Sequence, residues 1–115
     1  MATTRSVSTI TRASISLTAL AAAADATGDN FANTGNEFLY VNNGGGSSVT
    51  VTLVAQATLD GQSVTNKTVA VAAGIARLIG PFPKAIYNDA NDRMNITWSD
   101  VTSVSVAAIK LTPGQ

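Results

Sequence analysis

Four oxygen-bearing side chains lie within the five-residue stretch NDAND, at Asn88, Asp89, Asn91 and Asp92. Carboxylate and amide oxygens at such short spacing are ligands that calcium prefers, but the stretch lacks the central glycine and the distal glutamate of an EF-hand loop. Asn and Asp side chains also accept hydrogen bonds from their own backbone in turns. We therefore expect a solvated turn here, and no metal site.

Three consecutive glycines, Gly44–Gly46, raise the question of a phosphate-binding loop. Such a loop continues into Gly-Lys-Ser/Thr and the start of a helix, and neither follows here. Asn and Gly tolerate the left-handed backbone conformations of turns. The run NNGGGSS therefore predicts a long hairpin loop between a strand at Phe38–Val41 and a returning strand at Val49–Leu53.

The chain has no histidine and no cysteine. Zinc sites of the Cys/His kind, His-based triads and cysteine nucleophiles are therefore excluded. A general base would have to be Lys, Asp or Glu, and none of these stands in a recognisable catalytic arrangement. We expect no enzymatic activity and no cofactor.

Phe38, Tyr40 and Trp98 are the aromatic residues that could stack on a sugar or a base. Trp98 alternates in phase with Met94 and Ile96, which favours a place in the core. Tyr40 shares a strand face with Phe38, and its exposure stays open. A carbohydrate-binding or adhesion module is therefore an alternative function, although aromatic residues make up only 5% of the chain.

Residues 1–13 are polar, rich in Ser and Thr, and free of glycine and proline. Arg5 and Arg12 are the only charged residues among the first 24, and Val7 and Ile10 lie between them. A lightly charged segment of high β propensity can add as a strand to a neighbouring subunit or to a docking surface. The predicted partner-binding residues are Arg5, Val7, Ile10 and Arg12 of this N-terminal arm. A frayed terminus is the alternative.

Beyond the arm, alternation of apolar and polar residues predicts a series of short strands. The predicted strands are Arg12–Leu20, Phe38–Val41, Val49–Leu53, Thr68–Ala72, Ala76–Ile79, Lys84–Tyr87, Met94–Trp98 and Val101–Leu111. Asp60-Gly61 marks a turn, and Pro81 and Pro83 mark a sheet edge or a tight corner. The last strand changes phase, so we predict a β-bulge near Ala107–Ala108.

About seven to nine short strands with regularly spaced turn signals predict an all-β fold, an antiparallel β-sandwich of jelly-roll or immunoglobulin-like topology. At 115 residues the chain has the size of one domain. We assign residues 1–13 to the arm and residues 14–115 to the sandwich.

Charged residues make up 12% of the chain, with 7 basic and 7 acidic side chains and a net charge of zero. No basic stripe exists for nucleic acid, and a net charge near zero favours association. No run reaches the roughly 20 apolar residues of a membrane span. Ser14, Ser16 and Thr18 interrupt the apolar stretch near the N-terminus, so we expect no cleaved signal peptide. The expected partners include neither nucleic acid nor membrane.

The stretches GDNFANTGNEFLYVNNGGGSSVTVTL, VTNKTVAVAAGIARLIGPFP, YND and MNITWS resemble small structural proteins of tailed-phage virions. The shared positions follow an Asn-x-Gly-x-x-x-Leu-x-Val-x-Asn pattern, here Asn33 to Asn43, and a Gly-Pro-Phe corner, here Gly80 to Phe82. The resemblance covers about residues 15 to 111. It includes no matching motif in the N-terminal arm.

This resemblance implies a non-enzymatic virion structural protein on the capsid surface. Members look like β-sandwich head proteins, including capsid cement or decoration proteins that clasp the joints between capsid subunits, often as trimers. We therefore expect the major capsid protein and further copies of this chain, as a homotrimer, to be its partners. A tail or head-tail connector subunit stays open as an alternative, as does the carbohydrate-binding or adhesion module.

Overall fold

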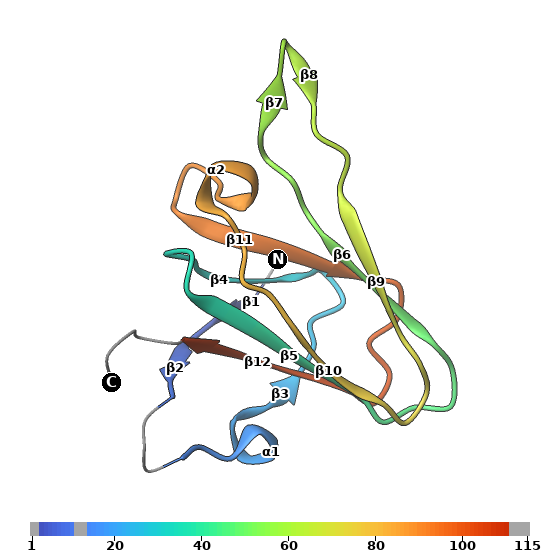
Figure 1. Cartoon of the computed structure of the whole chain (residues 1–115). Coiled ribbons are helices and arrows are strands. Elements are labelled where there is room, and N and C mark those ends of the chain that lie inside the picture. The colour runs from blue at the N-terminus through green and yellow to red at the C-terminus, as the bar shows by residue number, and fades with distance from the viewer. Residues whose placement is uncertain (1–2, 11–13, 111–115) are drawn as a thin grey trace.

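A computed structural model describes residues 3–10 and 14–110 of the chain. Strands account for 49% of the residues and helices for 7%. Two β-sheets pack face to face (Figure 1). The all-β sandwich predicted from the alternating pattern is confirmed. Its sheets are mixed, because two short N-terminal strands run parallel to their neighbours.

The first sheet has the strand order β1-β4-β11-β6-β9. Its strands are β1 (Thr3–Arg5), β4 (Asp29–Ala32), β11 (Arg93–Trp98), β6 (Val49–Leu53) and β9 (Lys67–Val71). The second sheet has the order β10-β5-β12-β2, and β3 also pairs with β12. Its strands are β10 (Ala76–Ile79), β5 (Glu37–Asn43), β12 (Val104–Lys110), β2 (Val7–Thr9) and β3 (Ala22–Ala23).

Three further elements lie outside these sheets. A two-stranded hairpin, β7 (Thr58–Leu59) and β8 (Gln62–Ser63), projects from the sandwich (Figure 1). Two single-turn helices, α1 (Leu17–Leu20) and α2 (Lys84–Tyr87), complete the described elements.

The core between the sheets follows from the alternation. In β6, Val49, Val51 and Leu53 are buried, whereas Thr50 and Thr52 are only half-buried on the outer face. The largest core side chains also come from the neighbouring strands: Phe31, Leu39, Val41, Met94, Ile96 and Val106. The predicted strands at β6, β9, β10 and β11 are confirmed, as is the corner at Pro81 and Pro83.

The predicted hairpin across residues 42–48 was wrong, because β5 belongs to one sheet and β6 to the other. The loop is an arch that crosses the sandwich, and buried Asn43 holds it. Asn43 Nδ2 donates to the carbonyl oxygens of Ser47 (2.8 Å) and Val71 (3.0 Å), and its Oδ1 accepts from the Gly45 N–H (3.1 Å). Asn and Gly signal a turn, but they do not tell whether the two strands pair with each other.

Two segments predicted as strands contain helical turns instead, at Leu17–Leu20 within the predicted strand Arg12–Leu20 and at Lys84–Tyr87. Arg12 and Ala13 of the first prediction lie outside the described residues. Ser16 caps α1, since its Oγ accepts from the Ala19 N–H (3.3 Å). Pro83 precedes α2 and has the extended backbone typical of a residue before a helix. Both segments were mispredicted because four residues show almost the same apolar spacing in a helical turn and in a strand.

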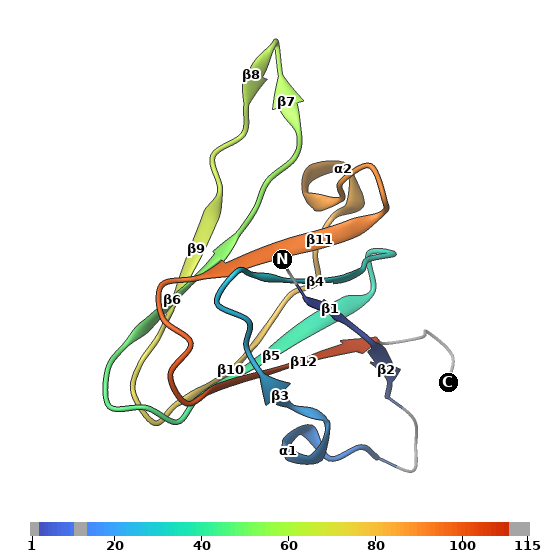
Figure 2. The same ribbon diagram turned by 180° about the vertical axis from the view of Figure 1, so that it is seen from behind.

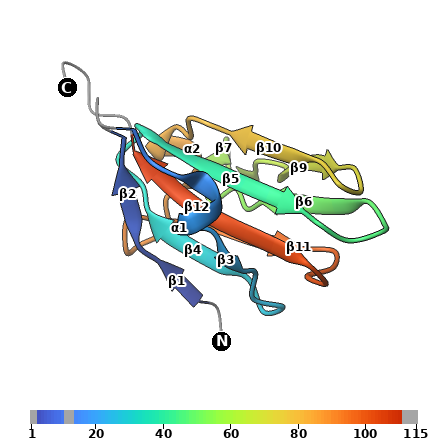
Figure 3. The same ribbon diagram turned by 90° about the horizontal axis from the view of Figure 1, so that it is seen from below.

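The predicted β-bulge in β12 is also wrong, since β12 pairs with β5 residue by residue along its whole length. Val104 and Val106 face the core between the sheets, whereas Ile109 packs on the opposite face beside Tyr40. The segment around α1 lies across that outer face (Figure 3) and covers it with Ile10, Ile15, Leu17 and Ala21. Both faces of β12 are therefore apolar, and no change of phase is needed.

Candidate interaction surfaces

The described part of the predicted N-terminal arm, residues 3–10, lies along one side of the sandwich and pairs with both sheets. β1 runs parallel to β4 at the edge of the first sheet, and β2 runs parallel to β12 in the second (Figure 2). Residues 3–9 therefore cross from one sheet to the other and close this side. The proposed domain boundary at residue 13 falls among residues 11–13, outside the described part of the chain.

Arg5 is the polar anchor of this segment. Its Nε donates to Asp29 Oδ1 (2.6 Å), and its Nη2 donates to the Ala23 carbonyl oxygen (2.5 Å). Asp29 is buried, and its Oδ2 also accepts from Trp98 Nε1 (2.7 Å) and the Asp25 N–H (3.1 Å). Hydrogen bonds to a charged partner are stronger than neutral ones, so this network fastens β1 to the body of the sandwich.

A second acidic side chain, Asp25, supports the same segment. Its Oδ2 accepts from the Thr3 hydroxyl, and its Oδ1 accepts from the N–H and the hydroxyl of Thr27 (both 2.8 Å). These hydrogen bonds, with that of Thr3 the most important, lower the pKa of Asp25 from 3.8 to about 2. Thr4 adds a hydrogen bond from its hydroxyl to Asn30 Oδ1 (2.9 Å).

The other predicted partner-binding residues occupy different surroundings. Val7 is half-buried against the core between the sheets, and Ile10 is half-buried against the cluster around Tyr40. Arg12 lies outside the described residues. The structure thus brings Arg5, Val7 and Ile10 onto one side of the sandwich, and their binding to another subunit stays a prediction.

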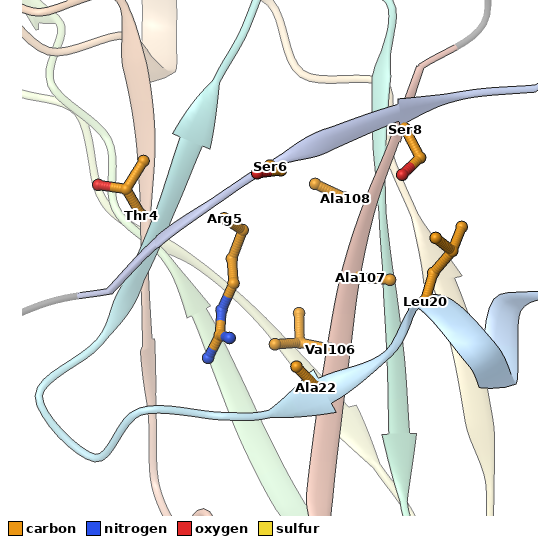
Figure 4. Close-up of a pocket in the computed structure, with 9 residues that line it drawn as sticks. All are labelled: Thr4, Arg5, Ser6, Ser8, Leu20, Ala22, Val106, Ala107 and Ala108. Carbon is orange, nitrogen blue, oxygen red and sulfur yellow. The ribbon is translucent and has the colours of Figure 1, made fainter.

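A cavity of about 320 Å³ lies beside this segment, between the N-terminal strands and β3 (Figure 4). Its lining includes Thr4, Ser6 and Ser8 on one side and Ala22 and Val106 on the other. Arg5 contributes the charge, but its guanidinium is already bonded to Asp29 and Ala23. The cavity therefore offers hydroxyl groups and aliphatic surface rather than a reactive pair.

The opposite side of the sandwich is open. β9 and β10 are the last strands of their sheets, and within the described residues each pairs with one neighbour. Leu78 is 57% exposed and Ile75 42% exposed, and Arg77 is the only charged residue from Ala70 to Gly80. An apolar edge strand with unpaired backbone groups is a ready site for another chain.

The stretch NDAND forms the predicted turn. Asp89 Oδ1 accepts from the backbone N–H groups of Asn91 (2.8 Å) and Arg93 (3.1 Å), and its Oδ2 accepts from Asn95 Nδ2 (2.8 Å). The hydrogen bond from Asn95 does most to lower the pKa of the Asp89 carboxyl. In residues 3–10 and 14–110, no group of three or more His, Cys, Asp or Glu side chains is placed to hold a metal ion.

The three aromatic residues considered for stacking do not form one platform. Phe38 and Tyr40 belong to β5 in the second sheet, whereas Trp98 belongs to β11 in the first. Tyr40 is buried, and half-buried Trp98 packs against the core and donates to Asp29.

The two stretches that carry the resemblance meet in the fold. Asn33 is buried, and its Nδ2 donates to the Phe82 carbonyl oxygen (3.0 Å) and to Asn88 Oδ1 (2.7 Å). Gly80 lies against β5 so closely that a Cβ there would be 3.0 Å from the Glu37 carbonyl oxygen. Asn33 and Gly80 thus hold the corner after β10 in place, which is a structural role.

Sequence reasoning missed Asp29 and Asp25, the acceptors of the Arg5 network. Asp29 alternates in phase with Phe31 at the start of a strand, which is an unusual place for a carboxylate. A carboxylate that faces the core needs a cationic partner, and the first 24 residues contain two arginines. The position of Asp29 was therefore the signal in the sequence that an arginine pairs with it.

No protein-family model matches the chain, and comparison with curated proteins and with solved structures found no significant match. Among the described residues, neither helix has the length and apolar character needed to span a bilayer.

Proposed function

We propose that this chain is a non-enzymatic structural protein of a tailed-phage virion, a capsid cement or decoration protein that binds and stabilises the shell of major capsid protein. The sequence resemblance supplies the phage context. The observation that carries an adhesive role is the open side of the sandwich, where Leu78 of edge strand β10 and Ile75, just before this strand, are exposed beside Arg77.

In this role β10 adds to an extended segment of the shell. Main-chain hydrogen bonds to a free strand edge supply affinity, and side chains on either face supply specificity. Leu78 would bury apolar surface worth about 25 cal/mol per Å². Repeated over many copies, a contact of modest strength stabilises a whole shell.

The closed side has a different part in the same role. The Arg5 network and the pairing of β1 and β2 keep the two sheets together without a disulfide. A homotrimer fits a local threefold position on a capsid, since closed symmetry of the partner matches that of its site.

Co-sedimentation with purified shells of the same virion tests the proposal. Leu78→Ser removes the exposed apolar group of β10 and is expected to weaken shell binding about tenfold, the effect of losing part of a buried leucine contact. Leu20→Ser is the matched control, because Leu20 is 39% exposed on the α1 side, away from β10. Equal binding by the Leu78→Ser variant and the unchanged chain would refute this use of β10.

The position of the protein on purified virions, seen by electron microscopy, separates the alternatives. Density on the shell surface supports the cement role. Density confined to the tail or to the head-tail junction would assign the chain to a tail or connector subunit instead.

A further inference from the structure

The β7–β8 hairpin presents an apolar side chain at the end of a projection (Figure 1). Leu59 is 77% exposed, the highest value among the large hydrophobic residues in the described part of the chain. Asp60 and Gly61 form the turn with φ angles of 55° and 78°, as a two-residue type I′ turn requires. A two-stranded hairpin on its own is marginally stable in water, so this tip has the character of a segment that binds something.

The hairpin carries a single charged side chain. Asp60 is the only charged residue between Val54 and Asn66. The base of the hairpin is fixed, because the N–H groups of Gln56 (2.8 Å) and Ala57 (3.1 Å) both donate to the Ile86 carbonyl oxygen beside it. The tip is thus a leucine next to one carboxylate, held away from the sandwich on an anchored base.

A cavity of about 160 Å³ lies at the base of the same hairpin. Its lining is mostly apolar and includes Ile79, Pro81, Pro83 and Tyr87, while Lys67 contributes the single positive charge. An apolar cavity of about 150 Å³ is large enough for benzene, so this one has room for the four-carbon side chain of a leucine. The apolar lining of this cavity matches Leu59 of the tip, and the positive charge of Lys67 matches the carboxylate of Asp60.

We propose that the hairpin tip of one copy seats in this cavity of a neighbouring copy, with Leu59 inside it and Asp60 facing Lys67. The inference rests on the proposed assembly role and specifies how copies contact one another. A copy cannot fill its own cavity, because the hairpin projects away from the sandwich (Figure 1) and the six residue steps from Gly61 to Lys67 reach roughly 20 Å when extended.

The geometry of the contact follows from its two different halves. Tip and cavity are distinct surfaces of the same chain, so the contact runs head to tail, and such contacts form rings when the rotation closes. In a closed ring every copy gives its tip and receives another, which agrees with the proposed homotrimer.

Disulfide cross-linking tests the contact directly, since the natural chain has no cysteine. Gln62→Cys places a thiol beside Leu59, its neighbour across the hairpin, and Lys67→Cys places one at the cavity. Under mild oxidation a mixture of the two variants is expected to give a linked dimer on a non-reducing gel, because a disulfide needs Cα atoms within about 7 Å. Linkage of either variant alone but not of the mixture would overturn the proposal.

Substitutions at the tip give an independent measure by analytical ultracentrifugation. Leu59→Ser is expected to raise the dissociation constant between copies at least about tenfold, since it removes the buried apolar group. Asp60→Asn keeps the turn chemistry and is expected to raise the constant about threefold while flattening its salt dependence. Gln62→Ser is the matched control on the same tip. Unchanged association of the Leu59→Ser variant would contradict the proposal.

Both assays use the purified chain without any shell, so they separate this inference from the proposed function. Weakened self-association of the Leu59→Ser variant supports the tip contact. If the Leu78→Ser variant binds shells normally in the same series, the use of β10 is refuted while the tip contact stands. Normal self-association of the Leu59→Ser variant would refute the tip contact between copies. If the same variant also fails to co-sediment with shells, the hairpin is a shell contact instead.

Discussion

The two long sides of the sandwich are built in opposite ways. On one side, residues 3–9 pair with both sheets, and Arg5 reaches a buried carboxylate at Asp29. On the other side, β9 and β10 end their sheets with exposed edges, and Leu78 stands 57% exposed. Bonded charged side chains, Arg5, Asp25 and Asp29, thus close one side, whereas the strand edges of the other side stay open.

This difference separates stability from binding. Groups on the closed side are buried or bonded to one another, so changing them alters the free energy of unfolding. Exposed groups on the open side contribute little to that free energy, because substitutions of exposed residues typically change stability by less than about 0.5 kcal/mol. Variants on the two sides are thus expected to fall into two classes, folding variants and binding variants.

The largest expected effect is on the closed side, at Asp29. Asp29→Asn keeps the shape but removes the charge that faces Arg5. It also leaves one amide oxygen where the Arg5 Nε–H, the Asp25 N–H and the Trp98 Nε1–H all need an acceptor. Breaking one partner of a buried ion pair costs about 3 kcal/mol or more. Urea unfolding monitored by Trp98 fluorescence measures the loss. Asp60→Asn, the same change at the exposed hairpin turn, is the control and should leave the midpoint unchanged.

A smaller effect is expected at Gly80, which joins the open strand β10 to the corner that follows. Its φ of 134° lies in a region that other residues rarely adopt, and a Cβ would be 3.2 Å from the Phe38 Cα. Gly80→Ala is expected to cost about 2 kcal/mol, because it adds backbone strain to a close contact. Gly46→Ala is the control, since a Cβ there meets nothing within 4 Å. Equal unfolding midpoints for the two variants would show that the corner beside the open side adapts freely.

The sequence predicted those parts of the fold that depend on one strand at a time. Alternation in Val49–Leu53 and in Met94–Trp98 was sufficient, because each strand has one face toward the core. It failed for β12, where Ile109 packs under the α1 segment and both faces are apolar. Alternation reports how many faces are covered, and only the packed structure shows what covers them.

The arrangement between strands was less accessible. Nothing in Asn42–Ser48 shows that the loop crosses between sheets, since the buried amide of Asn43 acts through a distant partner, the Val71 carbonyl oxygen. The partner of Arg5 is also distant along the chain, because Asp29 lies 24 residues from Arg5 and 69 residues from Trp98, which donates to the same carboxylate. The side-chain types of the N-terminal segment could be predicted to bind a strand edge, but not which edge.

The smallest expected effect concerns Asp25, which supports the closed side from the surface. Its pKa is about 2 in the folded chain, below the usual 3.8, chiefly because the Thr3 hydroxyl donates to its carboxylate. A carboxyl with a lowered pKa stabilises the fold above its unfolded pKa and loses that contribution as pH falls through its folded pKa. The stability difference between the unchanged chain and Asp25→Asn should therefore be constant above about pH 5 and shrink between about pH 4 and pH 2.

Asp89 and Asp100, whose pKa values are also lowered, titrate in both proteins, so the difference isolates Asp25. A difference that stays the same down to pH 2 would mean that the bond between Thr3 and Asp25 does not help to hold the N-terminal strand in place.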